Sequence, residues 1–93
     1  MADLASVHVI VHGRVQGVNF RAFAARRAEE LGLTGYVRNL ANGAVEVVAE
    51  GERDGLKKLS EYLKTGPPSA RVDSIVTDWS EYSGSYSEFD IRY

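Results

Sequence analysis

The chain has 93 residues, 44% of them hydrophobic, a length that suits one domain and excludes a second catalytic domain. It contains no cysteine, so a disulfide framework, a thiolate nucleophile and a cysteine-based metal site are excluded. The formal net charge of -2 argues against a nucleic-acid-binding protein, because affinity for a phosphate backbone needs an excess of clustered Lys and Arg. We therefore expect residues 1–93 to form a single domain that binds any anion locally.

The N-terminal sequence MADLASVHVIV has no basic segment before its short apolar run, so it lacks the pattern of a signal peptide. No stretch approaches the length of a membrane-spanning helix. The lack of cysteine also fits a reducing compartment. These features predict a soluble, cytoplasmic protein without a membrane partner.

The first predicted elements are a strand and a helix joined by a loop. Ser6 to His12 alternate with a period of two and are rich in β-branched residues, which predicts a strand. Apolar residues recur at helical spacing from Phe20 to Leu31, and Gly32 followed by Leu33 resembles a C-terminal cap.

A hairpin is predicted next. Thr34 to Leu40 and Ala44 to Glu50 have the composition of strands, and the pair Asn42-Gly43 between them is a strong turn signal because both residues tolerate positive φ. These two strands should pair antiparallel.

The second half of the chain completes the fold. Leucines at helical spacing from Leu56 to Leu63, followed by Gly66 and two prolines, predict a second helix. Arg71 to Ser80 and Phe89 to Tyr93 are predicted strands. The order βαββαβ with an added short strand predicts an α+β fold, a ferredoxin-like split βαβ sandwich with two helices on one face of a mainly antiparallel sheet.

The stretch HGRVQGVNFR, His12 to Arg21, connects the first strand to the first helix. Unpaired N–H groups and the positive end of the dipole at a helix N-terminus favour an anion. Gly13 and Gly17 allow successive backbone amides to turn inward, and Arg21 adds a planar fork of donors suited to phosphate oxygens. The stretch therefore predicts a phosphate site.

Chain length brings Asn39 back to that site. About ten helical residues carry the chain roughly 15 Å away, and the strand that ends at Asn39 recovers roughly 16 Å. The first two strands should lie parallel, linked by a right-handed crossover. Asn39 is thus expected beside Arg21.

At these positions the sequence resembles the acylphosphatase family. The resemblance rests on GRVQGVNFR, GYVRNLANGAVEVVAEG (Gly35 to Gly51) and GPPSARV (Gly66 to Val72), and it covers nearly the whole chain. It implies hydrolysis of the carboxyl–phosphate bond of small acyl phosphates to a carboxylate and inorganic phosphate. It also implies a mechanism with no metal, no cofactor and no covalent enzyme intermediate, in which a substrate phosphate oxygen accepts the proton of the attacking water.

The resemblance also assigns residue roles. Arg21 matches the arginine that holds the substrate phosphate, and Asn39 matches the asparagine that orients the attacking water. The phosphate cradle, acting mainly through backbone N–H groups, comprises Val15, Gln16, Gly17, Val18, Asn19 and Phe20 together with Arg21.

Two cradle residues have a second interpretation. Asn19 stands at a position that varies in the family; its amide could cap the helix and occupy N–H groups, or point to solvent, and we expect a small effect on rate. Gln16 could simply brace the loop.

Other polar residues are expected to be structural. His8 and His12 share a strand face but lie roughly 13 Å apart, too far to share a metal ion. Glu46 and Glu50 are expected on a solvated face of their strand. Three tyrosines are expected to pack the last strand: Tyr82, Tyr86 and Tyr93.

Rival functions are a non-catalytic ferredoxin-like regulatory domain that binds a small anion, and a stand-alone relative of the carbamoyl-phosphate-handling domain of hydrogenase maturation proteins. An RNA-recognition module is disfavoured because the strand GAVEVVAE lacks aromatic residues. The sequence does not specify the acyl group of the substrate, and we expect a monomer.

Overall fold

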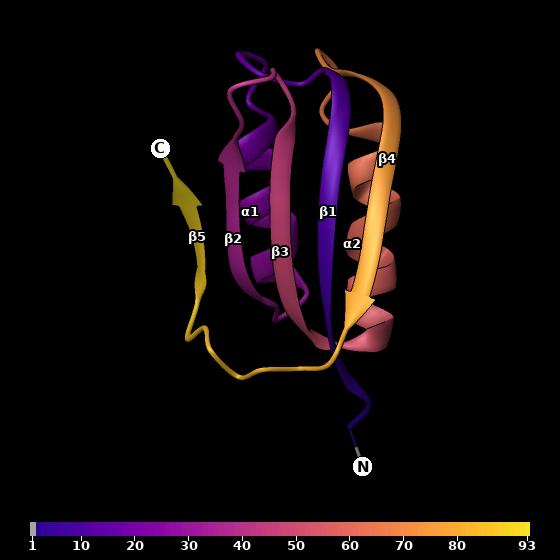
Figure 1. Cartoon of the computed structure of the whole chain (residues 1–93), viewed down its shortest axis with the longest axis vertical. Coiled ribbons are helices and arrows are strands. Elements are labelled where there is room, and N and C mark those ends of the chain that lie inside the picture. Colours follow the sequence, from indigo (N-terminus) through magenta and orange to yellow (C-terminus); the bar gives the residue numbers. More distant parts are fainter. Residues whose placement is uncertain (1) are drawn as a thin grey trace.

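The computed structural model describes residues 2–93, which form a five-stranded sheet with two helices on one face (Figure 1). The element order is as predicted, and the first strand extends further at both ends than the pattern indicated. In chain order the elements are β1 (Leu4–Arg14), α1 (Phe20–Glu30), β2 (Thr34–Asn39), β3 (Val45–Glu52), α2 (Arg53–Thr65), β4 (Arg71–Ser80) and β5 (Phe89–Arg92).

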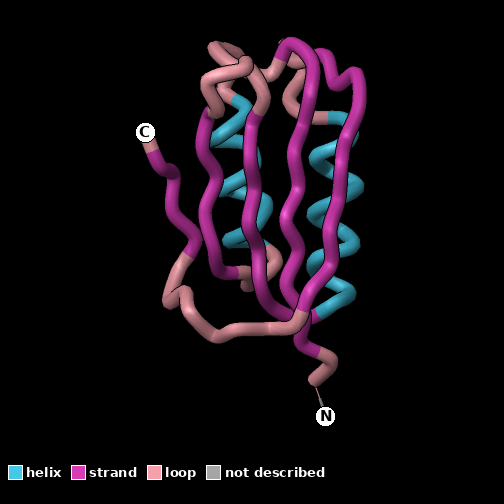
Figure 2. Tube along the Cα trace, in the orientation of Figure 1, coloured by secondary structure: helices cyan, strands magenta, loops and turns pink. Residues whose placement is uncertain are grey.

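The strands lie in the order β4-β1-β3-β2-β5. β3 pairs antiparallel with both β1 and β2, so these two strands run parallel to each other, as predicted. β5 pairs parallel with β2 at one edge of the sheet. The chain reaches that edge by a long segment that crosses below the sheet from β4 to β5 (Figure 2). The predicted ferredoxin-like sandwich is confirmed.

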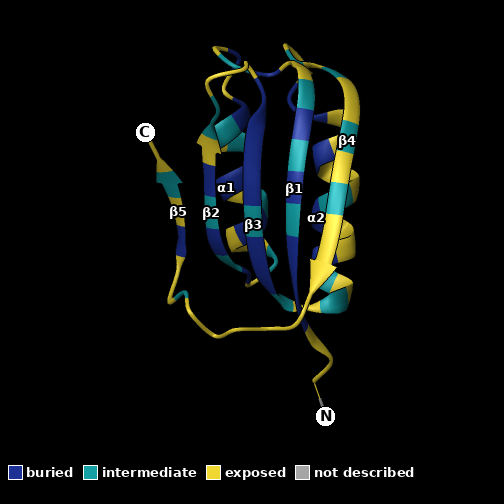
Figure 3. Ribbon diagram, viewed as in Figure 1, coloured by how far each residue is buried: buried dark blue, intermediate teal, exposed yellow. Residues whose placement is uncertain are grey.

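The core lies between the sheet and the helices, and Figure 3 shows that β3 is buried along most of its length whereas the edge strand β4 is largely exposed. Alternate residues of β1 point into the core because strand side chains alternate between faces. Each fully buried aliphatic side chain contributes about 1.5–3 kcal/mol relative to an exposed one. The fully buried side chains include Val7, Val9, Val11, Phe20, Val37, Val45, Val47, Leu56, Leu59 and Leu63.

Both helices end where the sequence indicated. Gly32 adopts φ 70°, and its N–H donates a hydrogen bond to the Glu29 carbonyl. The N–H of Leu33 donates to the Ala28 carbonyl, and these two hydrogen bonds together form a Schellman cap. α2 ends at Gly66, whose N–H donates to the Tyr62 carbonyl. Within residues 2–93, no helix combines the length and the apolar character needed to cross a membrane.

The β2–β3 turn forms at the predicted place but with a different backbone. Of its central pair only Gly43 has a positive φ, of 91°. Asn42 instead accepts a hydrogen bond from the N–H of Ala44 through its side-chain oxygen, at 3.0 Å. The turn closes through a 2.8 Å hydrogen bond from the N–H of Leu40 to the Ala44 carbonyl.

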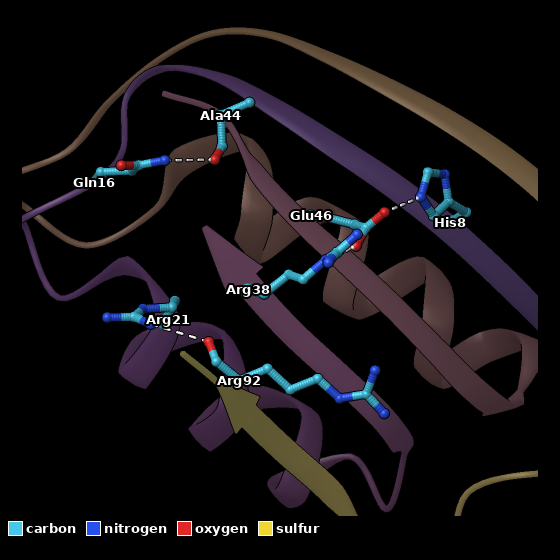
Figure 4. Close-up of polar contacts among 7 residues, drawn as sticks. All are labelled: His8, Gln16, Arg21, Arg38, Ala44, Glu46 and Arg92. Carbon is cyan, nitrogen blue, oxygen red and sulfur yellow. Dashed lines mark hydrogen bonds and ion pairs between the residues drawn. The ribbon is translucent and has the colours of Figure 1, made fainter. Parts of the chain in front are cut away.

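Glu46 lies on the helix-free face of the sheet, yet only 8% of it is exposed, so the expected solvated position is wrong. Its carboxylate accepts hydrogen bonds from His8, at 2.8 Å, and from Arg38 (Figure 4). Burial raises the pKa of Glu46, but the hydrogen bonds from His8 and Arg38 outweigh it and leave the pKa below its usual value. The carboxylate is therefore a buried, paired anion, and His8 has the structural role expected for it.

Glu50 is buried still more completely, with 2% exposed, so the same expectation is wrong for this residue. Its oxygens accept hydrogen bonds from the N–H and hydroxyl of Ser83, at 3.0 and 2.6 Å, and from the N–H of Gly84, at 3.0 Å. Burial raises the pKa of Glu50, but these bonds outweigh it and the pKa is lowered from 4.5. Glu50 thus fastens the segment between β4 and β5 to the centre of the sheet.

We predict that Glu50→Gln lowers the free energy of unfolding by about 1–3 kcal/mol at pH 7, because the variant loses charge-assisted hydrogen bonds in a buried setting. Since folding lowers this pKa, the stabilisation is fully present above pH 4.5 and disappears as pH falls through the lowered pKa. The difference from the parent protein should therefore shrink at pH 3. Urea unfolding at both pH values measures it.

Glu81→Gln is the matched control, because Glu81 is an exposed residue of the same segment and the charge change is identical. A loss of stability equal in the two variants, or unchanged at pH 3, would contradict the role assigned to Glu50.

Candidate active site

The loop between β1 and α1 has the backbone shape of an anion-binding nest. Gly17 has φ 73° and Asn19 has φ 63°, so the chain turns sharply just before the helix begins. Among the described residues, no backbone amide from 16 to 19 donates to a protein acceptor. These N–H groups, next to the N-terminus of α1, are therefore free for an anion.

The apolar residues of the loop turn their side chains away from solvent. The side chains of Val15, Val18 and Phe20 are buried in the core. The carbonyl of Val18 also accepts a 3.1 Å hydrogen bond from the hydroxyl of Ser69, in the turn after α2. The loop is thus fixed from the core side and from the α2–β4 connection.

Gln16 braces the loop from a third direction. Its side-chain amide donates to the carbonyl of Leu40 at 2.8 Å and to that of Ala44 at 2.9 Å (Figure 4 draws the second bond). Both acceptors belong to the turn that follows β2. The bracing interpretation is confirmed for the side chain, and it ties the loop to the strand end that bears Asn39.

Arg21 lies in the first turn of α1, and its Nη1 donates to the Arg92 carbonyl at 3.0 Å (Figure 4). Its guanidinium carbon lies 4.5 Å from the centroid of the Tyr93 ring. This contact leaves other guanidinium donors available and restricts the side chain to one side of the site.

A cavity of about 270 Å³ brings the predicted pair together. Arg21 and Asn39 both line it, as chain length predicted, and no acidic side chain does. The Asn39 Oδ1 is buried and has no hydrogen-bond partner among the described residues. The lining residues are Val15, Gly17, Asn19, Phe20, Arg21, Ala22, Asn39, Ile91 and Tyr93.

The sequence profile of the Acylphosphatase family matches residues 7–91. The chain belongs to the acylphosphatase family. An acylphosphatase of an Anaeromyxobacter species is 46% identical over 93 residues, the full length of both chains. Among solved structures, the acylphosphatase of Bacillus subtilis superposes with a TM-score of 0.92 at 37% identity, covering 96% of this chain and 99% of its own. That of Coxiella burnetii gives 0.91 at 46% identity, covering 97% and 94%.

Asn19 has a left-handed backbone conformation, with φ 63°. Among residues 2–93 it is the only non-glycine residue with positive φ, a conformation that asparagine tolerates better than most residues. Its side chain makes no capping hydrogen bond, so the capping interpretation is wrong, and the residue is exposed as the alternative proposed.

Two groups that contact Arg21 were not predicted from the sequence. The Arg92 carbonyl and the Tyr93 ring both contact Arg21. Tyr93 was expected to pack the last strand, but 99% of it is exposed, so that expectation is wrong. The available signal was the strand FDIRY itself, whose parallel register pairs Arg38 with Arg92, next to Asn39.

Of the other two tyrosines, Tyr86 packs against the ring of Tyr36 in β2, with centroids 6.0 Å apart, and Tyr82 is 43% exposed. Within residues 2–93, no three His, Cys, Asp or Glu side chains gather closely enough to hold a metal ion.

We predict that Asn19→Gly changes the rate modestly and keeps the fold, because glycine adopts φ 63° without a steric penalty. Asn19→Ala is the informative counterpart, since a Cβ without a polar group raises the cost of this conformation by about 1 kcal/mol. Thermal unfolding and steady-state kinetics with benzoyl phosphate test both. A loss of more than about a hundredfold in kcat for Asn19→Gly would assign the amide a catalytic role.

Proposed function

We propose that this acylphosphatase hydrolyses small acyl phosphates by direct attack of water, with Arg21 holding the phosphate and Asn39 orienting the water. The observation that carries the proposal is that Arg21 and Asn39 line one cavity at the end of a loop of free amides. Phosphoryl transfer to water requires mainly positioning and stabilisation of charge, and this cavity supplies both.

In this mechanism the loop amides and the Arg21 guanidinium bind the three non-bridging phosphate oxygens. Arg21 is pre-oriented by the Arg92 carbonyl, so little side-chain entropy is lost when the substrate enters. As charge accumulates on these oxygens during transfer, the fixed donors stabilise it without reorganising.

The side-chain amide of Asn39, which lines the cavity, hydrogen-bonds the attacking water and aims a lone pair of the water oxygen at phosphorus. The new bond joins the water oxygen to phosphorus, the bond from phosphorus to the acyl oxygen breaks, and the carboxylate leaves with the electron pair. The water proton passes to a phosphate oxygen of the substrate. No histidine or acidic side chain lines the cavity to act as a base, and a carboxylate leaving group makes a strong base unnecessary.

The rival functions have weaker support. A non-catalytic anion-binding domain would not need an amide side chain such as that of Asn39 beside the arginine in the cavity. A relative of a carbamoyl-phosphate-handling domain has less support, because this chain is 46% identical to an acylphosphatase over 93 residues. Loss of ultraviolet absorbance of benzoyl phosphate on addition of the protein tests hydrolysis directly.

A monomeric state and a cytoplasmic location are also part of the proposal. The lack of cysteine fits a reducing compartment, and a small acylphosphatase has a complete cavity within one chain. Sedimentation velocity tests the first, and fractionation of the producing cells tests the second.

We predict that substitutions of Arg21 and Asn39 have different effects on phosphate binding and on the chemical step. Arg21→Gln removes a charge that complements phosphate in both the ground state and the transition state, so inhibition by inorganic phosphate and turnover should weaken together. Asn39→Ala removes an amide that acts only as the water approaches, so phosphate inhibition should persist while kcat falls by several orders of magnitude.

Circular dichroism would show that each variant is folded, and calorimetry would measure phosphate binding where no activity remains. Near-normal kcat for Asn39→Ala would mean that another group orients the water and that the proposed pair is wrong.

We predict that exhaustive treatment with EDTA leaves kcat and KM for benzoyl phosphate unchanged, because the proposed phosphate ligands are backbone amides and a guanidinium. The same kinetics after addition of Mg²⁺ to the treated protein are the control. Inactivation by EDTA and recovery with a divalent cation would contradict the proposed ligand set.

A further inference from the structure

A second hollow, of about 490 Å³, lies on the outer side of α1 next to the catalytic cavity. Asn19 and Ala22 line both, so the two form a continuous surface. We call this hollow the Arg26 groove; it is lined by Asn19, Ala22, Phe23, Arg26, Arg27 and Pro67.

Arg26 is the positively charged residue of the groove whose side chain has no acidic partner among the described residues. It is exposed, and among residues 2–93 it forms no ion pair or side-chain hydrogen bond. Arg27, by contrast, pairs with Glu30 at 3.2 Å and lies 4.4 Å from the centroid of the Tyr62 ring. No acidic residue lines the groove, so the charge of Arg26 is available to an anion.

Arg26 is directed toward the catalytic cavity by helix geometry. It stands one turn after Ala22, about 6 Å along the axis. Side chains of a helix lean toward its N-terminus, and Arg26 lines the same hollow as Ala22 and Asn19. An anion held there would lie beyond the phosphate site, along the surface of α1.

Two walls of the groove, Phe23 and Pro67, are apolar and fixed. Phe23 packs on Phe20, with centroids 6.1 Å apart, and on Tyr62, at 6.5 Å. Pro67 is buried, and the bond from Ser69 to Val18 holds its turn against the phosphate loop. A carbon skeleton could therefore lie on Phe23 and Pro67 while its far end reaches Arg26.

The proposed reaction gives the groove a direction relative to the phosphate. In-line displacement places the attacking water and the leaving oxygen on opposite sides of phosphorus. Asn39, which orients the water, lines the cavity but not the groove. Asn19 and Ala22 line both the cavity and the groove, so the groove offers the acyl group a path out of the cavity that does not pass Asn39.

We propose that the Arg26 groove is the acyl subsite and that it favours acyl phosphates carrying a second anionic group at the far end of the acyl part. This inference rests on the proposed function and deepens it. Arg26 binds the distal anion in the ground state and in the transition state alike, so it acts on KM more than on kcat.

The test compares benzoyl phosphate with 4-carboxybenzoyl phosphate, which has the same ring and adds one distal carboxylate. A 4-phosphonobenzoyl phosphate arm distinguishes a preference for carboxylate from one for phosphate-like groups. In the parent protein the carboxylated substrate should have a KM about tenfold lower, the size of one charge-assisted hydrogen bond. The substrate ratio is kcat/KM for 4-carboxybenzoyl phosphate divided by kcat/KM for benzoyl phosphate. Arg26→Gln should reduce this ratio about tenfold, and Arg26→Lys should restore part of it.

Lys58→Gln is the matched control, because it removes one positive charge from an exposed position on α2 that lines a separate hollow beside Trp79. It should leave the substrate ratio unchanged. An equal fall in both variants would mean that overall charge, not the groove, sets the preference, and would overturn the inference.

The two proposals fail in different ways. Equal KM for the two benzoyl substrates, with a ratio unaffected by Arg26→Gln, would overturn the subsite and leave the proposed function in place. Hydrolysis of neither substrate by the parent protein would overturn the proposed function and the subsite with it.

Discussion

The site depends on the register of β3 with its two neighbours. Val45 of β3 pairs with Val11 of β1 on one side and with Asn39 of β2 on the other. Because backbone hydrogen bonds specify this register and a one-residue slip would expose the core face, the ends of β1 and β2 are held at the same level of the sheet. The loop that follows β1 and the residue that ends β2, Asn39, therefore lie at the same end of the sheet.

Side-chain contacts then tighten what the sheet places approximately. Gln16 connects the phosphate loop to the turn after β2, and Ser69 connects it to the turn after α2. Gly17 and Asn19 have left-handed conformations, so the loop cannot continue as a helix or a strand. The loop amides therefore remain directed at the cavity. A loop held at three places loses little entropy when it binds an anion, which is the property that a catalytic cradle needs.

The helix-free face of the sheet supports the same site from a distance. Glu50 fastens the segment that leads to β5, and the N–H of Gly35 donates to the carbonyl of Glu88 just before that strand. β5 in turn presents the Arg92 carbonyl to Arg21. The buried carboxylate of Glu50 and the orientation of the Arg21 guanidinium are thus linked through β5. The Arg26 groove adds a second cation on the outer side of α1.

Periodicity, turn residues and chain length were sufficient to determine the element order, the sandwich fold, the loop at the start of α1 and the meeting of Arg21 with Asn39, because all of these follow from local backbone preference and the fixed rise of helices and strands. The remaining features come from residues far apart in the chain. Gln16 meets Leu40 across 24 positions, Glu50 meets Ser83 across 33, and Arg21 meets Arg92 across 71. No local pattern encodes such pairs. Only the folded sheet, which brings distant segments together, decided that Glu46 and Glu50 are buried and that Arg21 has a hydrogen-bond partner.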